Sequence, residues 1–144
     1  MTPDLHAALQ ALPHGRSFRF IDELRSLDPG REATAFYQVR GDEPFLEDHF
    51  PGNPMLPGVI LIEAIAQLGG VVVQSDTEHP AMSDLRLTGV RGAKILGAGL
   101  PGELLEIHAK VEGRLGGLAQ VGGEVRGPHG ILATAKVTLS GKLP

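Results

Sequence analysis

The chain has 144 residues, 42% of them hydrophobic and 21% charged, with a formal net charge of −4 and no cysteine. This length and composition predict a single globular domain over residues 1–144, and the acidic balance argues against nucleic-acid binding. The lack of cysteine excludes disulfides and thiolate chemistry. Residues 1–16 have no basic stretch followed by an apolar one, so no signal peptide is expected. Together with the lack of cysteine, this favours a cytoplasmic protein.

The N-terminal third of the chain is predicted to contain one short helix and two strands. Residues 4–12 have a helix-forming composition between a capping Asp4 and a terminating Pro13. After them we expect, in chain order, a strand at 17–27, a turn at 28–30, a strand at 32–40 and a loop with four prolines at 41–57.

The next segment, PGVILIEAIAQLGGVVV (57–73), is almost wholly apolar and has Glu63 as its one charge. Its β-branched residues leave a strand as the competing local structure. Its length, and the four-residue spacing that would place Glu63 and Gln67 on one helix face, favour a helix from about Pro57 to Gln74. Such a helix would be surrounded by protein, since it is apolar on all sides and too short to span a bilayer.

The second half of the chain is predicted to be mainly β-structure. In LEIHAKVEG (105–113) and ILATAKVTL (131–139), every second residue is apolar, which is the period of a half-buried antiparallel strand. An antiparallel sheet of about six strands would then wrap around the apolar helix, giving an α+β fold. Weaker, glycine-interrupted strands are expected at 85–96 and 118–126. Turns are expected at 100–103 and 127–130.

Three residues between positions 49 and 67 have the chemistry needed to abstract a proton next to a carbonyl group. His49 is the one histidine close to the helix start, and histidine is the usual general base near neutral pH. The apolar neighbourhood of Glu63 should raise its pKa and let it act as an acid. Gly58 would lie at the helix N-terminus, where backbone N–H groups favour developing negative charge. Spacing alone leaves purely structural roles open for all three.

The segment HFPGNPMLPGVILIEAIAQ (49–67) resembles the core motif HFPGxPxxPGVxxxEAxAQ of the β-hydroxyacyl-acyl carrier protein dehydratases. Upstream, LPHGRSFRFID (12–22) is similar to the family's LPHRxPFLLVD. Downstream, GVRGAKILGAGLPGELLEI (89–107) is similar to its strand–PGD–strand segment. The resemblance covers nearly the whole chain. It implies a hotdog fold and an obligate homodimer, alone or as a trimer of dimers, with active sites at the subunit interface.

The implied reaction is dehydration of a (3R)-3-hydroxyacyl thioester, held by the phosphopantetheine of an acyl carrier protein, to the trans-2-enoyl thioester without a cofactor. His49 would remove the proton α to the carbonyl. The partner's Glu63 would protonate the departing hydroxyl or hold the released water. The Gly58 N–H would bind the thioester oxygen, and Gln67 would orient Glu63. The residues implied to support the site are Phe50, Pro51, Gly52, Pro57 and His14.

The details of the motif bear on subtype and partner. Glutamate at position 63 is typical of the branch that dehydrates without isomerising. The stretch AKILGAG (93–99) is less basic than the family's usual ARFKRPV, which leaves a coenzyme A thioester or the carrier of a specialised pathway open. No metal site is expected, because the other histidines lack ligand spacing with carboxylates. A hotdog thioesterase and a non-catalytic acyl-binding subunit are the alternative functions.

Overall fold

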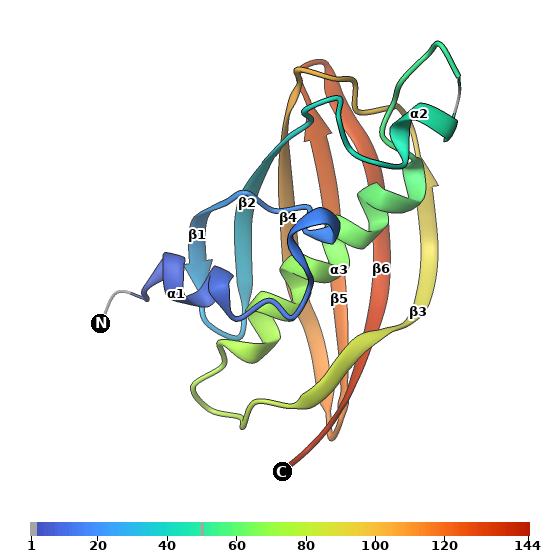
Figure 1. Ribbon diagram of the computed structural model, residues 1–144. Helices are drawn as coiled ribbons and strands as arrows, with labels where there is room; N and C mark the ends of the chain where they lie inside the picture. The colour runs from blue at the N-terminus through green and yellow to red at the C-terminus, as the bar shows by residue number, and fades with distance from the viewer. Residues whose placement is uncertain (1–2, 50) are drawn as a thin grey trace.

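The computed structural model describes residues 3–49 and 51–144 and shows one antiparallel sheet crossed by a long helix (Figure 1). The strands pair in the order β1-β2-β4-β5-β6-β3, so β1 and β3 form the two edges. The strands are β1 (Glu23–Asp28), β2 (Glu32–Gln38), β3 (Ser83–Ile95), β4 (Leu104–Leu115), β5 (Leu118–Gly127) and β6 (Gly130–Lys142). The helices are α1 (Leu5–Gln10), the 3₁₀ helix η1 (Arg16–Phe18), α2 (Leu46–His49) and α3 (Gly58–Gln74). The predicted α+β fold is confirmed.

Helix α3 forms where the apolar run predicts it and is enclosed by protein, as expected. It contacts every strand from β2 to β6. The segment between α1 and β1 crosses the helix on the side away from the sheet (Figure 1). No helix within the described residues is long and apolar enough to cross a membrane. Side chains that are completely buried on α3 include Leu61, Ile65, Leu68 and Val72.

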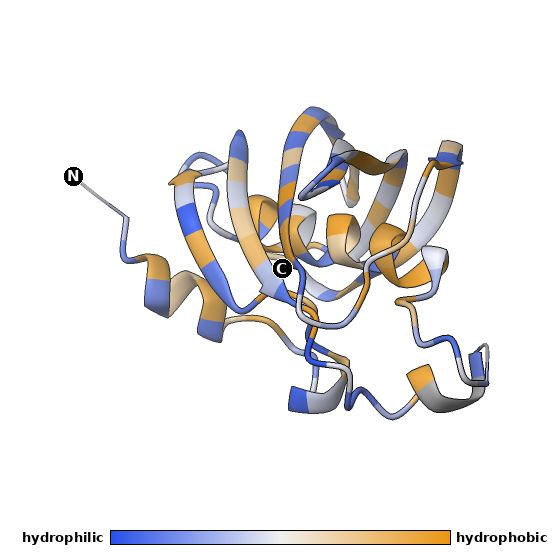
Figure 2. Ribbon diagram, turned by 90° about the horizontal axis from the view of Figure 1, so that it is seen from above, coloured by the Kyte–Doolittle hydropathy of each residue, from blue (hydrophilic) through white to orange (hydrophobic). Residues whose placement is uncertain are grey.

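The alternation predicted for the second half of the chain is present in the sheet. On β4, Leu105 and Ile107 are buried, whereas the intervening Glu106 and His108 are partly exposed. Alternating apolar and polar bands run along the strands in Figure 2. One face of the sheet therefore packs on α3, as period-two strands require. The corresponding inward residues of β6 are Ala133, Ala135, Val137 and Leu139.

Gly123 of β5 allows α3 to lie close to the sheet. A Cβ at this position would lie 2.5 Å from Cγ2 of Ile65 and 2.6 Å from the carbonyl oxygen of His108. A larger residue would therefore have to push the helix off the sheet, which close-packed interiors resist. The glycine here serves a close approach of helix and strand.

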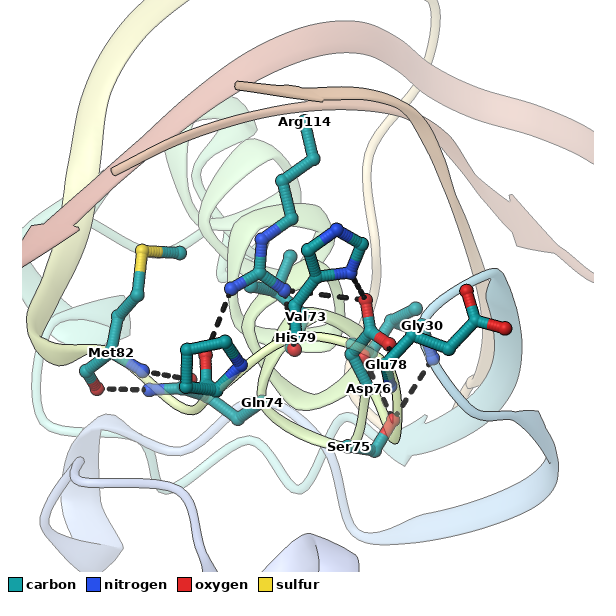
Figure 3. A network of polar contacts seen from close by, with 11 residues as sticks. Gly30, Val73, Gln74, Ser75, Asp76, Glu78, His79, Met82 and Arg114 are labelled. Atoms are coloured by element: carbon teal, nitrogen blue, oxygen red, sulfur yellow. Dashed lines mark hydrogen bonds and ion pairs between the residues drawn. The ribbon is translucent and has the colours of Figure 1, made fainter. Parts of the chain in front are cut away.

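The C-terminal end of α3 is fixed by a network of polar contacts (Figure 3). Arg114 of β4 donates hydrogen bonds to the carbonyl oxygens of Val73 and Pro80. The same guanidinium lies 3.4 Å from the carboxylate of Asp76, which also accepts from the N–H of Glu78. A cation that binds last-turn carbonyls is favoured by the helix dipole. This network fixes the position of α3 along the sheet.

Two expectations for the first half of the chain are wrong in part. The strand predicted over 17–27 begins only at Glu23, because η1 takes its first residues. The backbone groups of Phe18 and Phe20 bond to the side chain of Gln67 instead of to another strand. The proline-rich loop predicted before α3 also contains the short helix α2.

Candidate active site

Glu63 is the one charged residue of α3, and it lines a cavity while keeping 19% of its side-chain area exposed. Burial raises the pKa of Glu63, and the nearby His14 ring and Gln67 amide oppose that rise. A carboxyl group with a raised pKa keeps its proton at higher pH than an ordinary glutamate does. Glu63 therefore has the property that a general acid needs.

Gln67 lies one helical turn beyond Glu63 and is 2% exposed. Its side-chain nitrogen donates to the carbonyl oxygen of Phe18 at 2.8 Å, and its side-chain oxygen accepts from the N–H of Phe20 at 2.9 Å. Both bonds tie the N-terminal segment to α3. Gln67 therefore links the turn of helix that carries Glu63 to the segment that carries His14.

His14 faces Glu63, with Nε2 of the ring 3.6 Å from Oε1 of the carboxyl group. Arg19 closes the segment around His14 by donating to the carbonyl oxygens of Leu12 and His14. The imidazole ring lies beside Phe18, with a centroid separation of 6.3 Å. A supporting role was expected for His14 from the sequence. Its position against Glu63 depends on the long-range fold, and no local pattern points to it.

His49 ends the short helix α2, and the loop that follows orients its ring. Nδ1 lies 3.2 Å from the carbonyl oxygen of Met55, a distance at which an N–H donates to it. In a neutral ring this bond selects the tautomer with the proton on Nδ1, which leaves Nε2 as the nitrogen that can accept a proton. Met55 takes part through its backbone, so the sequence held no sign of its role.

The loop between α2 and α3 contains several of the residues expected to support the site. Gly52 has a φ of +79°, a conformation that favours glycine. The N–H of Leu56 donates to the carbonyl oxygen of Gly99 at 2.7 Å, which anchors the loop beside the sheet. Pro51 is exposed in the same loop, and Phe50 lies outside the described residues.

Gly58 is the first residue of α3 and follows Pro57, whose extended backbone leads into the helix. The first N–H groups of a helix have no acceptor within it, so the Gly58 amide can bind an anionic oxygen. A Cβ on Gly58 would collide with the side chain of Ile95. The glycine is thus also needed for packing of β3 against the helix start.

A cavity of about 370 Å³ lies between α1, α3 and β3, and Glu63, His14 and Gln67 line it together. This volume is in the range of small-ligand sites. Much of the remaining lining is apolar and includes Ala66 and Leu85. His49, although described, does not line this cavity, so a single chain does not bring the proposed base and acid into one pocket.

The remaining histidines of the described residues form ion-pair contacts or lie exposed. Nδ1 of His79 lies 2.8 Å from the carboxylate of Asp76, and Nε2 of His108 lies 3.3 Å from that of Glu32. Among the residues that the structure describes, no three His, Asp or Glu side chains gather in a way that could hold a metal ion.

The FabA-like domain family matches residues 12–126 of the chain. The chain belongs to this family. It is 37% identical over 109 residues to the 3-hydroxyacyl-[acyl-carrier-protein] dehydratase FabZ of Nitratidesulfovibrio vulgaris, covering 75% of this chain and 71% of that protein. It is 34% identical over 135 residues to the FabZ dehydratase of Polynucleobacter necessarius, covering 94% of this chain and 90% of that protein. The resemblance read from the sequence motifs is confirmed.

Solved structures share the fold of this FabA-like chain. The dehydratase heterocomplex ApeI:P of Xenorhabdus doucetiae superposes with a TM-score of 0.77 at 19% identity, covering 96% of this chain and 91% of that one. Zebra fish thioesterase superfamily member 2 superposes with a TM-score of 0.67 at 16% identity, covering 92% of this chain and 90% of that one. At such identities the likeness concerns the fold alone. That fold is the hotdog fold expected from the motifs.

Proposed function

We propose that the protein is a 3-hydroxyacyl-[acyl-carrier-protein] dehydratase that converts (3R)-3-hydroxyacyl thioesters to trans-2-enoyl thioesters. The observation that carries the proposal is the placement of Glu63. This carboxyl group lies on an apolar helix, its pKa is raised by burial, and it lines a cavity of small-ligand size. The dehydratase relatives support the choice of reaction.

The proposed reaction needs His49 as a base that accepts a proton and Glu63 as an acid that gives one. Nε2 of His49 takes a proton from the α carbon, and the electrons of that C–H bond move onto the thioester oxygen. The N–H of Gly58 stabilises this oxyanion. The electrons then return to form the double bond between C2 and C3 while the C3–O bond breaks. Glu63 gives its proton to the departing hydroxyl group, which leaves as water.

We further propose that His49 and Glu63 of one site come from two subunits of a homodimer. Edge strand β3 pairs only with β6 among the described strands, and a long unpaired edge invites another chain. Val90 and Ile95 of this strand are 46% and 50% exposed, and Val59 at the start of α3 is 68% exposed. A second copy pairing along β3 would cover these apolar side chains.

The cavity beside Glu63 is suited to the acyl chain of the substrate. Its apolar lining residues would solvate methylene groups, and Glu63 lies in its wall. The thioester end of the substrate would then lie toward His49 and the Gly58 amide of the second subunit. This orientation places C2 and C3 between the base and the acid.

The carrier is proposed to be acyl carrier protein, acting in cytoplasmic fatty acid synthesis or a related acyl-chain pathway. Arg86, Arg91 and Lys94 are exposed on β3 and offer positive charge to an acidic carrier. The chain itself has a net charge of −4, so these residues would act locally on an otherwise acidic protein. Coenzyme A thioesters are the alternative substrates.

The test is a hydration and dehydration assay with four-carbon enoyl and 3-hydroxyacyl thioesters on both carriers. The enoyl thioester absorbance reports dehydration, and free thiol reports hydrolysis. His49→Ala and Glu63→Gln should each lower turnover by about 10²–10⁴, as expected for loss of a general base or acid. Wild-type turnover in either variant would remove that residue from the mechanism. Release of thiol without formation of the enoyl product would assign the protein to the thioesterases.

Mixing the two inactive variants tests the shared site directly. A mixed dimer of His49→Ala and Glu63→Gln subunits has one site with both groups intact and one with neither. Random exchange of subunits should therefore restore about a quarter of wild-type activity if the sites lie across a two-fold interface. If both groups act from the same subunit, the mixture stays inactive.

A further inference from the structure

His14 and Glu63 lie close together on the wall of the cavity described above. Nε2 of His14 is 3.6 Å from Oε1 of Glu63, and the two side chains keep 30% and 19% of their area exposed. This separation allows a charge interaction and is longer than a direct hydrogen bond. A small rotation of either side chain would bring the two groups into hydrogen-bond contact.

The backbone around His14 is tied to the same helix that carries Glu63. Nη2 of Arg19 donates to the carbonyl oxygens of Leu12 and His14, at 3.2 Å and 3.3 Å, and closes this segment on itself. The far end of the segment is held by the two backbone hydrogen bonds of Gln67, one turn from Glu63. The position of the ring relative to the carboxyl group is therefore set by α3 itself.

The hydrogen-bonding pattern of the ring favours one tautomer. Nδ1 of His14 is buried and has no hydrogen-bond partner among the described residues. A proton on Nδ1 would be a buried donor without an acceptor, which is costly, whereas a proton on Nε2 points toward Glu63. The neutral ring therefore presents an N–H group to the carboxylate.

We propose that His14 is a positioning residue for Glu63, and that its Nε2–H holds the carboxyl group in the orientation from which it reaches the substrate. The inference rests on the proposed function, because it assigns a task within that site. His14 acts through Glu63 and does not touch the reacting atoms. Apart from Gln67, the neighbours of Glu63 on its own helix are mostly aliphatic, so His14 adds a polar contact from outside the helix.

The contact has an electrostatic consequence that a packing role lacks. Burial raises the pKa of Glu63, and His14 lowers it. Loss of the ring should therefore raise the pKa of Glu63 further. The other charged groups that line the cavity are Arg86 and Asp84 of β3. Because they and Gln67 remain in every variant, a change in the titration of Glu63 is attributable to His14.

Three variants separate positioning from packing. His14→Phe keeps an aromatic ring beside Phe18 and removes the N–H group, whereas His14→Gln keeps an N–H donor without the ring. His129→Gln is the matched control, because His129 is exposed in the turn between β5 and β6. The full-length dimer is assayed for kcat from about pH 5 to about pH 9. Glu63 is titrated separately through its carboxyl ¹³C signal, which needs no substrate.

We expect His14→Phe to lower kcat by about 10- to 100-fold, since displacing a catalytic group by ~1 Å costs about 10². The pH at which Glu63 loses its proton should rise in the ¹³C titration. Because protonated Glu63 is the active form, the alkaline fall in kcat should move to higher pH in parallel. His14→Gln should recover most of both effects, and His129→Gln should match the wild type.

The outcomes distinguish this inference from the proposed function. An unmoved Glu63 titration in His14→Phe would overturn the inference, whether kcat were unchanged or uniformly lowered at every pH. Failure of His14→Gln to restore either property, in a protein that melts like the wild type, would also overturn it. An inactive wild type would refute the dehydratase assignment alone, because the ¹³C titration would still report on the contact.

Discussion

Replacing Gln67 with leucine should destabilise the fold and disorganise the site together. The substitution keeps a side chain of similar volume and removes two hydrogen bonds, one from the N–H of Phe20 at 2.9 Å and one to the carbonyl oxygen of Phe18 at 2.8 Å. Both bonds hold the segment that carries His14 against α3. The change therefore tests whether this side chain joins the two parts of the site.

The expected loss of stability follows from what is left unpaired. The Phe20 N–H is buried, and a stranded buried donor costs about 1–3 kcal/mol. The Phe18 carbonyl is only part-buried, so water can replace some of its lost bond. We expect a total of about 3 kcal/mol, which lowers the Tm of a domain of this size by about 6–12 °C.

Gln74 provides a matched control on the same helix. Its side chain makes the same pair of bonds to one backbone unit, donating to the Met82 carbonyl oxygen at 2.7 Å and accepting from the Met82 N–H at 2.9 Å. Gln74→Leu should also lower Tm. Gln74 lines the far part of the same cavity, but it lies about 16 Å along the helix from Glu63, farther than a four-carbon acyl chain reaches. Gln74→Leu should therefore leave kcat for a four-carbon substrate unchanged.

Thermal unfolding by circular dichroism and the four-carbon hydration assay give both quantities. We expect Gln67→Leu to lose activity well below its Tm, at temperatures where Gln74→Leu retains it. If Gln67→Leu melts with the wild type, its hydrogen bonds do not contribute as argued. If both variants lose activity equally, loss of function reflects general destabilisation, and Gln67 has no particular link to the site.

Two further predictions concern charged residues away from the cavity. Burial acts to raise the pKa of Glu43, but hydrogen bonds from the Tyr37 hydroxyl and nearby backbone N–H groups hold it below its usual value. The stability that Glu43 contributes to the fold is therefore fully present above its unfolded-state pKa and is lost as the pH falls through its folded-state pKa. Glu43→Gln should therefore make the unfolding free energy fall less steeply as the pH is lowered. Arg114→Met should lower the free energy of unfolding in urea by about 2 kcal/mol. This is less than the usual cost of breaking a buried ion pair, because His79 and the Glu78 N–H still contact Asp76. An unchanged unfolding midpoint would show that the network of Figure 3 does not hold the end of α3.

The central helix and the main strands could be predicted because their signals are local. Seventeen residues of α3 are almost all apolar, and β4 and β6 alternate with a period of two along their buried lengths. Each pattern states which face is buried. It does not state which strands pair, because β2 pairs with β4, and β3 pairs with β6 instead of with either of its neighbours in the chain. His49, Glu63 and Gly58 could be put forward as candidate site residues for the same reason, since they lie within one continuous motif.

The contacts around Glu63 could not be predicted because they join distant parts of the chain. The backbone of Phe18 is bonded to Gln67, 49 positions later, and this replaces the strand that the local pattern favours. His14 meets Glu63 only because that segment crosses α3. Met55 orients His49 through a carbonyl oxygen, which every residue possesses.

Two largely buried carboxyl groups in this chain show why Glu63, and not Glu43, is suited to acid chemistry. Glu43 is 3% exposed and accepts from the Tyr37 hydroxyl and the N–H groups of Arg40 and Gly41, and these bonds favour the anion enough to lower its pKa despite burial. Glu63 has fewer donors and a surrounding helix of aliphatic residues, so burial prevails and raises its pKa. For Glu43 the hydrogen bonds outweigh the effect of burial on the pKa, whereas for Glu63 they do not. Of the two groups, Glu63 therefore keeps its proton to higher pH, which suits the acid role proposed for it, and His14 lies near enough to oppose that shift.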